Sequence, residues 1–450
     1  MTDFEFAAEW CAAGNDAPEY YHTMARLALR VGNVNLMKNE DIWSRTIQKS
    51  VLVSAYPLAM WLASSWWRLN WEPLPAHSPS LDWRMTHEMG AANEGYVWPQ
   101  IIFASDWEAV KIWTPPSADD ENQSVKYLNG LAAPASIGLN GFQRGVEAFI
   151  TTVISRLDVS PGCRNTPLSD LWKIIQEERA VPEIAKYRRI EAEMGFDPDE
   201  CPEALMEKAL SFEQEMGIDA LHELTPVYGK SAKQTLIAAI RDIADSPGLI
   251  GKPAIIDSDD ITPFIQTTRD APWQHAVAKA GALRRMIGNT TNMINNAGLC
   301  DLLGLQASKV EEWAPAKRND AAVAVPEDPK QFKFIPRKKH PIAKRFELAR
   351  FIGDYLLTEP ANGHWLTSTD LRTARQKYQR AFAAEFLCPI DALCAFLEGD
   401  YSESAIEEAA DHFQVSQTTV TSLLLNNGIF PAASALDLDY DGGRVPYQLG

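Results

Sequence analysis

The stretch that decides the fold of this chain is RFELARFIGDYLL, residues 345–357. It predicts a helix with one apolar face, since its apolar residues recur every three or four positions: Phe346, Ala349, Ile352 and Leu356. A second helix is expected within 369–387, ending in the stretch RQKYQRAFAAEFLCP at 375–389. A third stretch, EEAADHFQVS at 407–416, reads as the start of a helix-turn-helix. Upstream of all three, KFIP at 333–336 predicts a short edge strand.

These stretches resemble, in the same order, the ImmA/IrrE family of metallopeptidases. The family pattern is RFxLAHELGHLLL, then ExxANxFAAELLMP, then an LAxxFxVS segment. The most specific match is FAAEFLCP at 382–389, and the resemblance covers residues 333–430, under a quarter of the chain. It implies a small zincin-like α+β domain in which two helices hold one zinc ion.

The zinc motif itself is lost. At the positions of the two histidines and the glutamate of HExxH stand Arg350, Asp354 and Phe351, and Gln376 replaces the third ligand, a glutamate. A guanidinium repels a cation, and the general base is missing, so we expect no peptidase activity, no catalytic residue, no bound metal and no cofactor. Arg350 and Asp354, one helical turn apart, either form an ion pair supported by Arg375 and Gln376 or are both solvated.

A binding groove can outlive the loss of the metal, because main-chain pairing with an edge strand does not need it. We therefore predict a protein partner that docks across the 333–336 edge and the basic 337–345 loop. The candidate partner-binding residues combine one edge-strand position with nearby cations: Phe334, Lys338, Lys339, Arg345, Arg350 and Arg375.

Nucleic-acid binding is the alternative. The window 330–350 holds eight Lys and Arg residues against one acid, Glu347. The helix-turn-helix-like end has no Lys or Arg between Arg380 and Arg444, so we interpret it as structural. The net charge of −18 also argues against general polyanion binding.

The rest of the chain predicts an α+β protein of three regions. Residues 1–160 hold ten of the fourteen tryptophans, which we interpret as the core of an α+β domain. Residues 161–312 are expected to be a helical connector or scaffold, and residues 313–450 form the degenerate peptidase domain. No apolar run is long enough for a membrane span and no signal peptide is recognised, so we expect a cytoplasmic protein without membrane contact.

Four local predictions concern the first region. We expect a helix over 19–30, a strand and buried helix over 50–67, a hairpin from 100–103 and 110–113, and a helix over 141–157. An enzyme of another class in this region would use Arg84, His87 and Glu88, which lie near the tryptophan-rich stretch. His87-Glu88 and His222-Glu223 each begin like HExxH, but neither has the second histidine.

The sequence thus favours a non-catalytic ImmA/IrrE-like pseudo-peptidase. By family analogy it would act as a regulatory, sensor or toxin-like component of a phage-defence or toxin–antitoxin-like system. Its expected partner is a small helix-turn-helix regulator.

Overall fold

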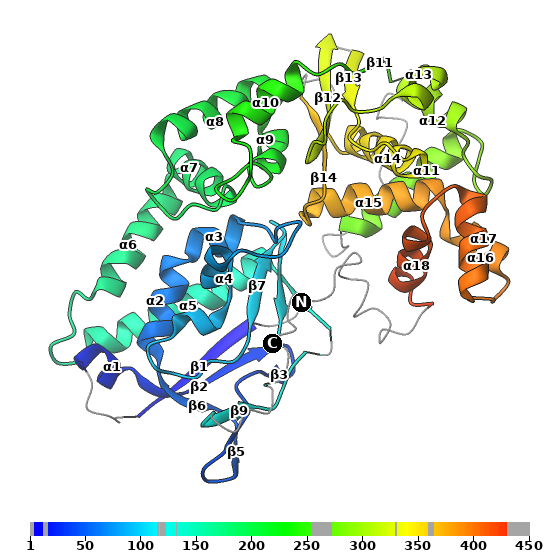
Figure 1. Cartoon of the computed structure of the whole chain (residues 1–450). Coiled ribbons are helices and arrows are strands. Elements are labelled where there is room, and N and C mark those ends of the chain that lie inside the picture. Colours follow the sequence, from blue (N-terminus) through cyan, green and yellow to red (C-terminus); the bar gives the residue numbers. More distant parts are fainter. Residues whose placement is uncertain are drawn as a thin grey trace. The chain divides into compact units, whose positions relative to one another are not determined.

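The computed structural model describes residues 4–11, 17–114, 117, 123–131, 133–253, 272–328, 331–358 and 364–429. The chain divides into two compact units, each with its own apolar core. Unit 1 contains Met1–Glu207 and Gly229–Ser231, and unit 2 contains Lys208–Tyr228 and Ala232–Gly450. Helices and sheets occur in both, so the protein is of the α+β class (Figure 1). None of the described helices combines the length and apolar character that a membrane crossing requires.

Unit 1 contains three small antiparallel sheets. In the first, β2 (Met24–Val31) pairs with β1 (Phe4–Trp10), β3 (Val34–Asn35) and β6 (Val51–Ser54). The order of the second is β10-β8-β7 and that of the third is β5-β4-β9. Their strands are β4 (Asn39–Asp41), β5 (Thr46–Gln48), β7 (Ile102–Ser105), β8 (Ala109–Trp113), β9 (Val125–Tyr127) and β10 (Ala135–Gly138).

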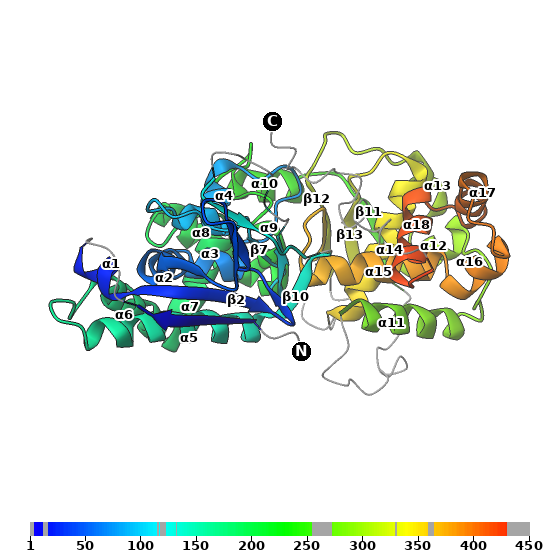
Figure 2. The same cartoon turned by 90° about the horizontal axis from the view of Figure 1, so that it is seen from below.

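The helices of unit 1 pack against strands of the first two sheets. They are α1 (Pro18–His22), α2 (Ala55–Ser64), α3 (Trp66–Trp71), α4 (Leu81–His87), η1 (Met89–Ala92), α5 (Leu139–Asp158), α6 (Pro167–Ala180) and α7 (Pro182–Glu193). Helix α5 runs along β1 (Figure 2). Gly145 permits this approach, because a Cβ there would lie 2.6 Å from the carbonyl oxygen of Phe4. Trp66 and Trp67 are buried in the core, as predicted for the tryptophan-rich stretch.

Three of the four local predictions for this region are confirmed: the hairpin β7–β8, helix α5, and strand β6 followed by α2 and α3. The helix expected over 19–30 is wrong. Only α1 is helical there, and β2 follows it at Met24. Strand β2 alternates between buried apolar and exposed charged residues and pairs with β1 over seven residues, and this pairing outweighs helix propensity.

Unit 2 is built on one four-stranded antiparallel sheet in the order β11-β13-β12-β14. The strands are β11 (Leu249–Gly251), β12 (Ala321–Asp328), β13 (Gln331–Ile335) and β14 (Leu366–Thr369). Its helices are α9 (Ile218–Leu224), α10 (Leu236–Ala244), α11 (Pro272–Met286), α12 (Asn296–Leu303), α13 (Ala307–Glu312), α14 (Pro341–Leu357), α15 (Ala374–Leu387), α16 (Ile390–Leu397), α17 (Glu403–Phe413) and α18 (Gln417–Asn426). Helix α8 (Glu203–Met216) spans the boundary between the units.

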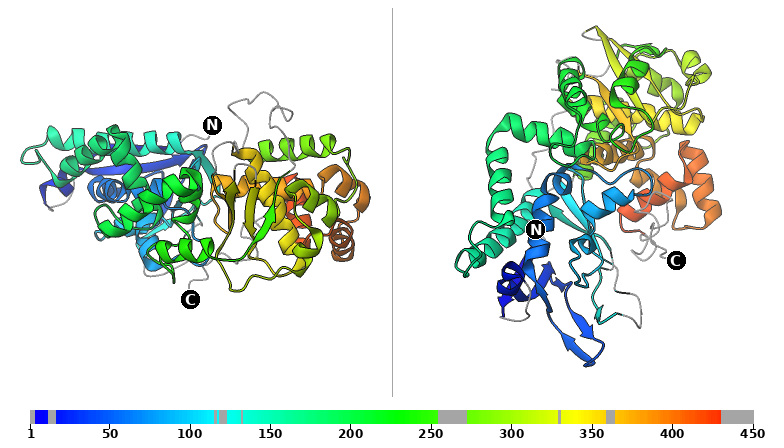
Figure 3. Two further views of the ribbon diagram at one scale, coloured as in Figure 1. Left: turned by 90° about the horizontal axis from the view of Figure 1, so that it is seen from above. Right: turned by 60° about the vertical axis from the view of Figure 1, so that its left-hand side comes forward.

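Helix α15 packs against both α11 and α14 in unit 2, and α14 and α15 both contact β14. The helix-turn-helix-like end consists of α17 and α18, which group with α16 and are drawn in orange to red (Figures 1 and 3). The chain therefore forms two units where three regions were predicted. Residues 161–312 are not a separate scaffold, because α6 and α7 belong to unit 1 and α9 to α13 belong to unit 2.

The edge strand predicted at 333–336 is also wrong. Phe334, in β13, pairs with Leu249 of β11 on one side and with Ala324 of β12 on the other. Strand β11 comes from about 80 residues upstream of β13, so no local pattern shows this pairing. The edge strand that lies beside α14 is β14.

Candidate functional site

Helices α14 and α15 bring the four motif positions into one region of unit 2. Arg350, Phe351 and Asp354 lie on α14, and Gln376 lies in the first turn of α15. The Thr373 side chain caps α15 by accepting a hydrogen bond from the Gln376 backbone amide at 3.2 Å. The sequence therefore places these residues on two packed helices, as the motif alignment implied.

Close contact between the two helices depends on a glycine. A Cβ on Gly353 of α14 would lie 2.9 Å from the ring of Phe382 in α15. Phe382 belongs to the FAAEFLCP stretch and is fully buried. The glycine thus lets the two helices approach until side chains at the motif positions meet.

Arg350, at the first histidine position, is buried and makes two hydrogen bonds. It donates to the backbone oxygen of Thr369 at 2.7 Å and to Oε1 of Gln376. Burial lowers its pKa to about 9, and the nearby cations Arg380 and Arg337 add to this effect. It remains charged at neutral pH, so a positive charge stands where the motif alignment would place a zinc ligand.

Asp354, at the second histidine position, is fully buried and pairs with Arg375 rather than with Arg350. Its two carboxylate oxygens accept from Nε and Nη2 of Arg375 at 2.7 and 3.0 Å. Burial is the largest single effect and disfavours the charge of Arg375, but Asp354, Glu223 and Asp219 together raise the pKa of Arg375 above its usual value. The ion pair expected between Arg350 and Asp354 is therefore wrong, and so is the alternative in which both are solvated.

Phe351 occupies the glutamate position and belongs to the apolar core. It is fully buried, and its ring lies edge-on to that of Phe334 with 5.6 Å between the ring centroids. No group at this position can accept a proton from water. The general base that the motif would supply is therefore absent from position 351.

The side chains at the motif positions close the edge of the sheet. Strand β14 pairs with β12 along one edge only. On its other edge, the backbone groups of Thr367 and Thr369 form hydrogen bonds with side chains in place of a further strand. Four buried side chains of α14 and α15 supply these caps: Arg350, Asp354, Gln376 and Gln379. The Thr367 amide donates to Asp354 and the Thr369 amide to Gln376, both at 2.9 Å. The Thr367 oxygen accepts from Gln379 at 2.8 Å. An added strand has no free backbone partner at these two residues.

Sequence reasoning missed Glu223 of α9 as a member of this cluster. It is fully buried, and its Oε1 accepts a hydrogen bond from Thr373 at 2.7 Å, while Oε2 has no hydrogen-bond partner among the described residues. Burial raises its pKa to about 7, although Arg375 and Thr373 act in the opposite direction. The only signal in the sequence is the half-motif His222-Glu223, which lacks the second histidine of HExxH.

The predicted partner-binding residues are mostly inaccessible. Phe334, Arg345 and Arg375 are buried or nearly so, like Arg350. Arg345 donates to Asn296 at 2.9 Å and to the Ile294 oxygen, and burial lowers its pKa to about 10. Among these candidates only Lys338 and Lys339 are accessible. A docking surface built on these six residues is therefore wrong.

The basic window 330–350 is not a continuous cationic surface either. Arg337 and Lys344 are also buried, and Lys344 donates to three backbone oxygens between Val310 and Trp313. Lys330 lies outside the described residues. Buried, hydrogen-bonded cations cannot neutralise phosphates, so Arg337, Lys344, Arg345 and Arg350 do not support nucleic-acid binding by this window, whereas Lys338 and Lys339 remain accessible.

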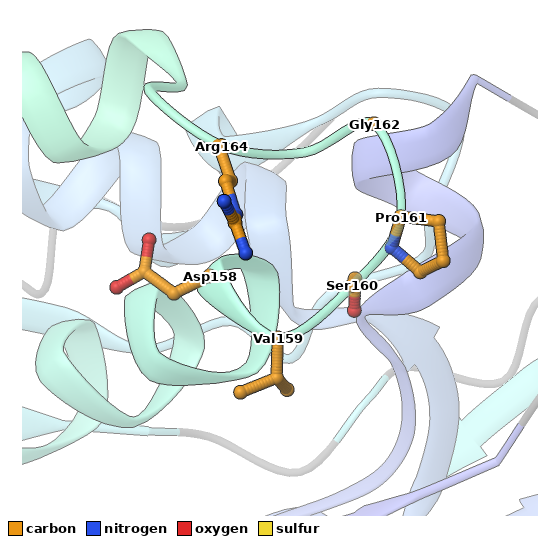
Figure 4. A pocket seen from close by; sticks show the side chains of 6 residues that line it. All are labelled: Asp158, Val159, Ser160, Pro161, Gly162 and Arg164. Atoms are coloured by element: carbon orange, nitrogen blue, oxygen red, sulfur yellow. The ribbon is translucent and has the colours of Figure 1, made fainter.

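In unit 1 the alternative catalytic trio does not form a reactive set. Arg84 and Glu88 pair with each other at 2.7 Å. His87 is fully buried, bonded to the Phe103 oxygen at 2.9 Å and to Glu72 at 3.0 Å. A surface hollow of unit 1 lies elsewhere, at the loop after α5, and is lined by Asp158, Val159, Ser160, Pro161, Gly162 and Arg164 (Figure 4). Its one hydroxyl, that of Ser160, donates to the Arg156 oxygen, and we assign the hollow no role.

Throughout the described part of the chain, no three His, Cys, Asp or Glu side chains are grouped so that they could hold a metal ion. The residues at the motif positions do not fit zinc, since they offer a guanidinium, a phenyl ring, an amide and one carboxylate already paired with Arg375. No family model matches this chain, nor does any curated protein or solved structure. The site is therefore interpreted from its own geometry.

Proposed function

We propose that residues 313–450 derive from an ImmA/IrrE-type peptidase domain and now act in protein binding and regulation without peptidase activity. The observation that carries the proposal is the buried network at the motif positions, in which Arg350 binds Gln376 and Asp354 binds Arg375. The network joins α14, α15 and β14. Because these side chains are hydrogen-bonded to one another, none of them is free to bind a metal or to activate water.

Two requirements of a zincin-like peptidase fail together in this network. The metal donors and the base are replaced, and the same replacements cap the edge strand β14. In active zincin-like peptidases the substrate lies extended along an edge strand beside the metal helix. A chain that closes this edge has lost substrate positioning as well as catalysis, which supports a non-enzymatic role.

The biological setting follows from family analogy. Active members cleave repressors of the helix-turn-helix kind, and a non-cleaving member would bind such a regulator without destroying it. We therefore propose a sensor, regulatory or toxin-like component in a phage-defence or toxin–antitoxin-like system. Its partner would be a small helix-turn-helix protein.

The test is to restore the motif. A quadruple variant with Arg350→His, Phe351→Glu, Asp354→His and Gln376→Glu would carry the complete set of ligands and the base. We expect it to bind equimolar zinc with a zinc-dependent rise in Tm, because a restored site couples metal binding to folding. The wild type should bind far less than equimolar zinc, as should the single variant Arg350→His, which serves as the control.

Two outcomes would overturn the proposal. Equimolar zinc in the wild-type protein, with cleavage of a helix-turn-helix repressor that a chelator abolishes, would show that peptidase activity survives. A quadruple variant that folds without zinc and never binds it would show that α14 and α15 are not the metal helices of this family.

A further inference from the structure

The hairpin formed by β4 and β5 in unit 1 carries exposed apolar side chains. It projects from the rest of its unit, at the bottom of Figure 1 and of the right panel of Figure 3. Trp43, in the turn, is 87% exposed, and Ile47, in β5, is 64% exposed. The turn is ordered by Asp41, which accepts the Ser44 amide at 2.9 Å. A tryptophan held on a structured turn with nearly its whole surface in water is a feature typical of binding sites.

Strand β5 is also an open edge. Within the described residues it pairs with β4 alone, in the register Asp41–Thr46, Glu40–Ile47 and Asn39–Gln48. This contrasts with β14, whose outward backbone groups are capped by side chains. Open edges with exposed apolar residues recruit further strands unless a protein blocks them.

We propose that β5 is a docking edge for an extended segment of another protein, in which acidic residues flank an apolar one. The segment would add a strand beside β5, with its apolar side chain against Ile47 and Trp43. This surface is separate from the α14–α15 site, so its test does not depend on the loss of peptidase activity.

The charges around β5 select the occupant. Arg45, the turn residue directly before β5, and Lys49, directly after it, are both exposed. The acids on β4 are less exposed than these cations: Glu40, opposite Lys126 of β9 in the strand register, and Asp41, which accepts a hydrogen bond from the Ser44 amide, are both half-buried. The exposed charges at the two ends of the edge are therefore positive, and they favour a segment in which carboxylates flank the central apolar residue.

A second copy of the chain fits this edge poorly. Antiparallel self-pairing centred on Ile47 would bring Arg45 of one copy near Lys49 of the other at both ends of the paired strands, because these cations flank β5 on either side. Like charges directly opposite each other destabilise a sheet pair. The edge therefore favours an acidic segment over self-association.

The probe is an acetylated, fluorescein-labelled heptapeptide with a central valine, threonine on each side, aspartate in the next positions and serine at both ends. Fluorescence anisotropy with the full chain should show saturable binding. Binding should weaken about ten-fold or more in Ile47→Ser and in the double variant Arg45→Glu, Lys49→Glu. Leu81→Ser, which changes an exposed apolar residue elsewhere in unit 1, is the matched control and should bind as the wild type does.

Exchanging the charges of the peptide and the hairpin distinguishes a loss of charge recognition from damage to the hairpin fold. The same peptide with lysines in place of aspartates should bind the Arg45→Glu, Lys49→Glu variant and not the wild type. The proposal is overturned if the acidic peptide does not bind the wild type or binds the reversed variant equally well. It is also overturned if sedimentation shows a dimer that Ile47→Ser dissociates, because the edge is then occupied by a second copy.

Discussion

Glu223 shows how a single residue can belong to a site that its sequence neighbours do not reveal. Its hydrogen-bond partner Thr373 lies 150 residues away in the chain, while the adjacent His222 suggested only an incomplete zinc motif. Arg350, Asp354 and Gln376 were identified from motif alignment, and the structure places them in one network. The sequence does not predict which of these side chains bind each other. Asp354 pairs with Arg375, and this choice depends on side-chain geometry that only the structure shows.

The raised pKa of Glu223 predicts a pH-dependent stability. Its pKa of about 7 in the folded chain lies above the ordinary value of 4.5, so the folded state holds the proton more tightly. This group therefore lowers the free energy of unfolding as pH rises from about 4.5 to 7, by up to about 3 kcal/mol. Glu223→Gln should remove this loss and be more stabilising, relative to the wild type, at pH 8 than at pH 5. Urea unfolding followed by circular dichroism at both pH values would check this, and an equal effect at both would contradict it.

At the level of elements, regular patterns were predictable and partners distant in sequence were not. Helix α5 and the hairpin β7–β8 follow from apolar periodicity within one segment. Strand β2 had a period-two pattern that was misread as part of a helix. The interior position of β13 depends on β11, whose three residues carry no pattern of their own. Short strands are recognised only when their neighbours are known.

The capped edge of β14 predicts unusual protection for an edge strand. The Thr367 and Thr369 amides are bound by buried side chains, so they should exchange with solvent slowly, whereas the three residues of β5 should exchange quickly. Gln376→Leu removes the acceptor for the Thr369 amide and should accelerate exchange about ten-fold or more across 366–369. Hydrogen–deuterium exchange with mass spectrometry would measure both strands in one experiment. Unchanged exchange at β14 in the variant would show that the side-chain caps do not protect the edge.

At the scale of the whole molecule, the division into units departs from the linear order of the chain. Residues Lys208–Tyr228 belong to unit 2, although Gly229–Ser231 return to unit 1. The sequence placed the boundary of the last region at 313, because the proline- and charge-rich passage there looks like a linker. That position lies between α13 and β12, inside unit 2.

This division predicts which fragment of unit 2 can fold. Helix α9 packs against β14, Glu223 bonds to Thr373, and the Trp365 amide donates to the Met216 oxygen at 3.0 Å. A fragment of residues 203–450 keeps these contacts, whereas 232–450 exposes one side of β14 and leaves Thr373 without its partner. We expect a cooperative thermal transition for 203–450 and a lower Tm or no cooperative transition for 232–450, because a domain that loses a packed helix loses apolar burial and buried hydrogen bonds together. Circular dichroism melts of the two fragments at equal concentration decide the matter. If 232–450 melted with the same midpoint and cooperativity as 203–450, α9 would not be part of the domain that carries the candidate site.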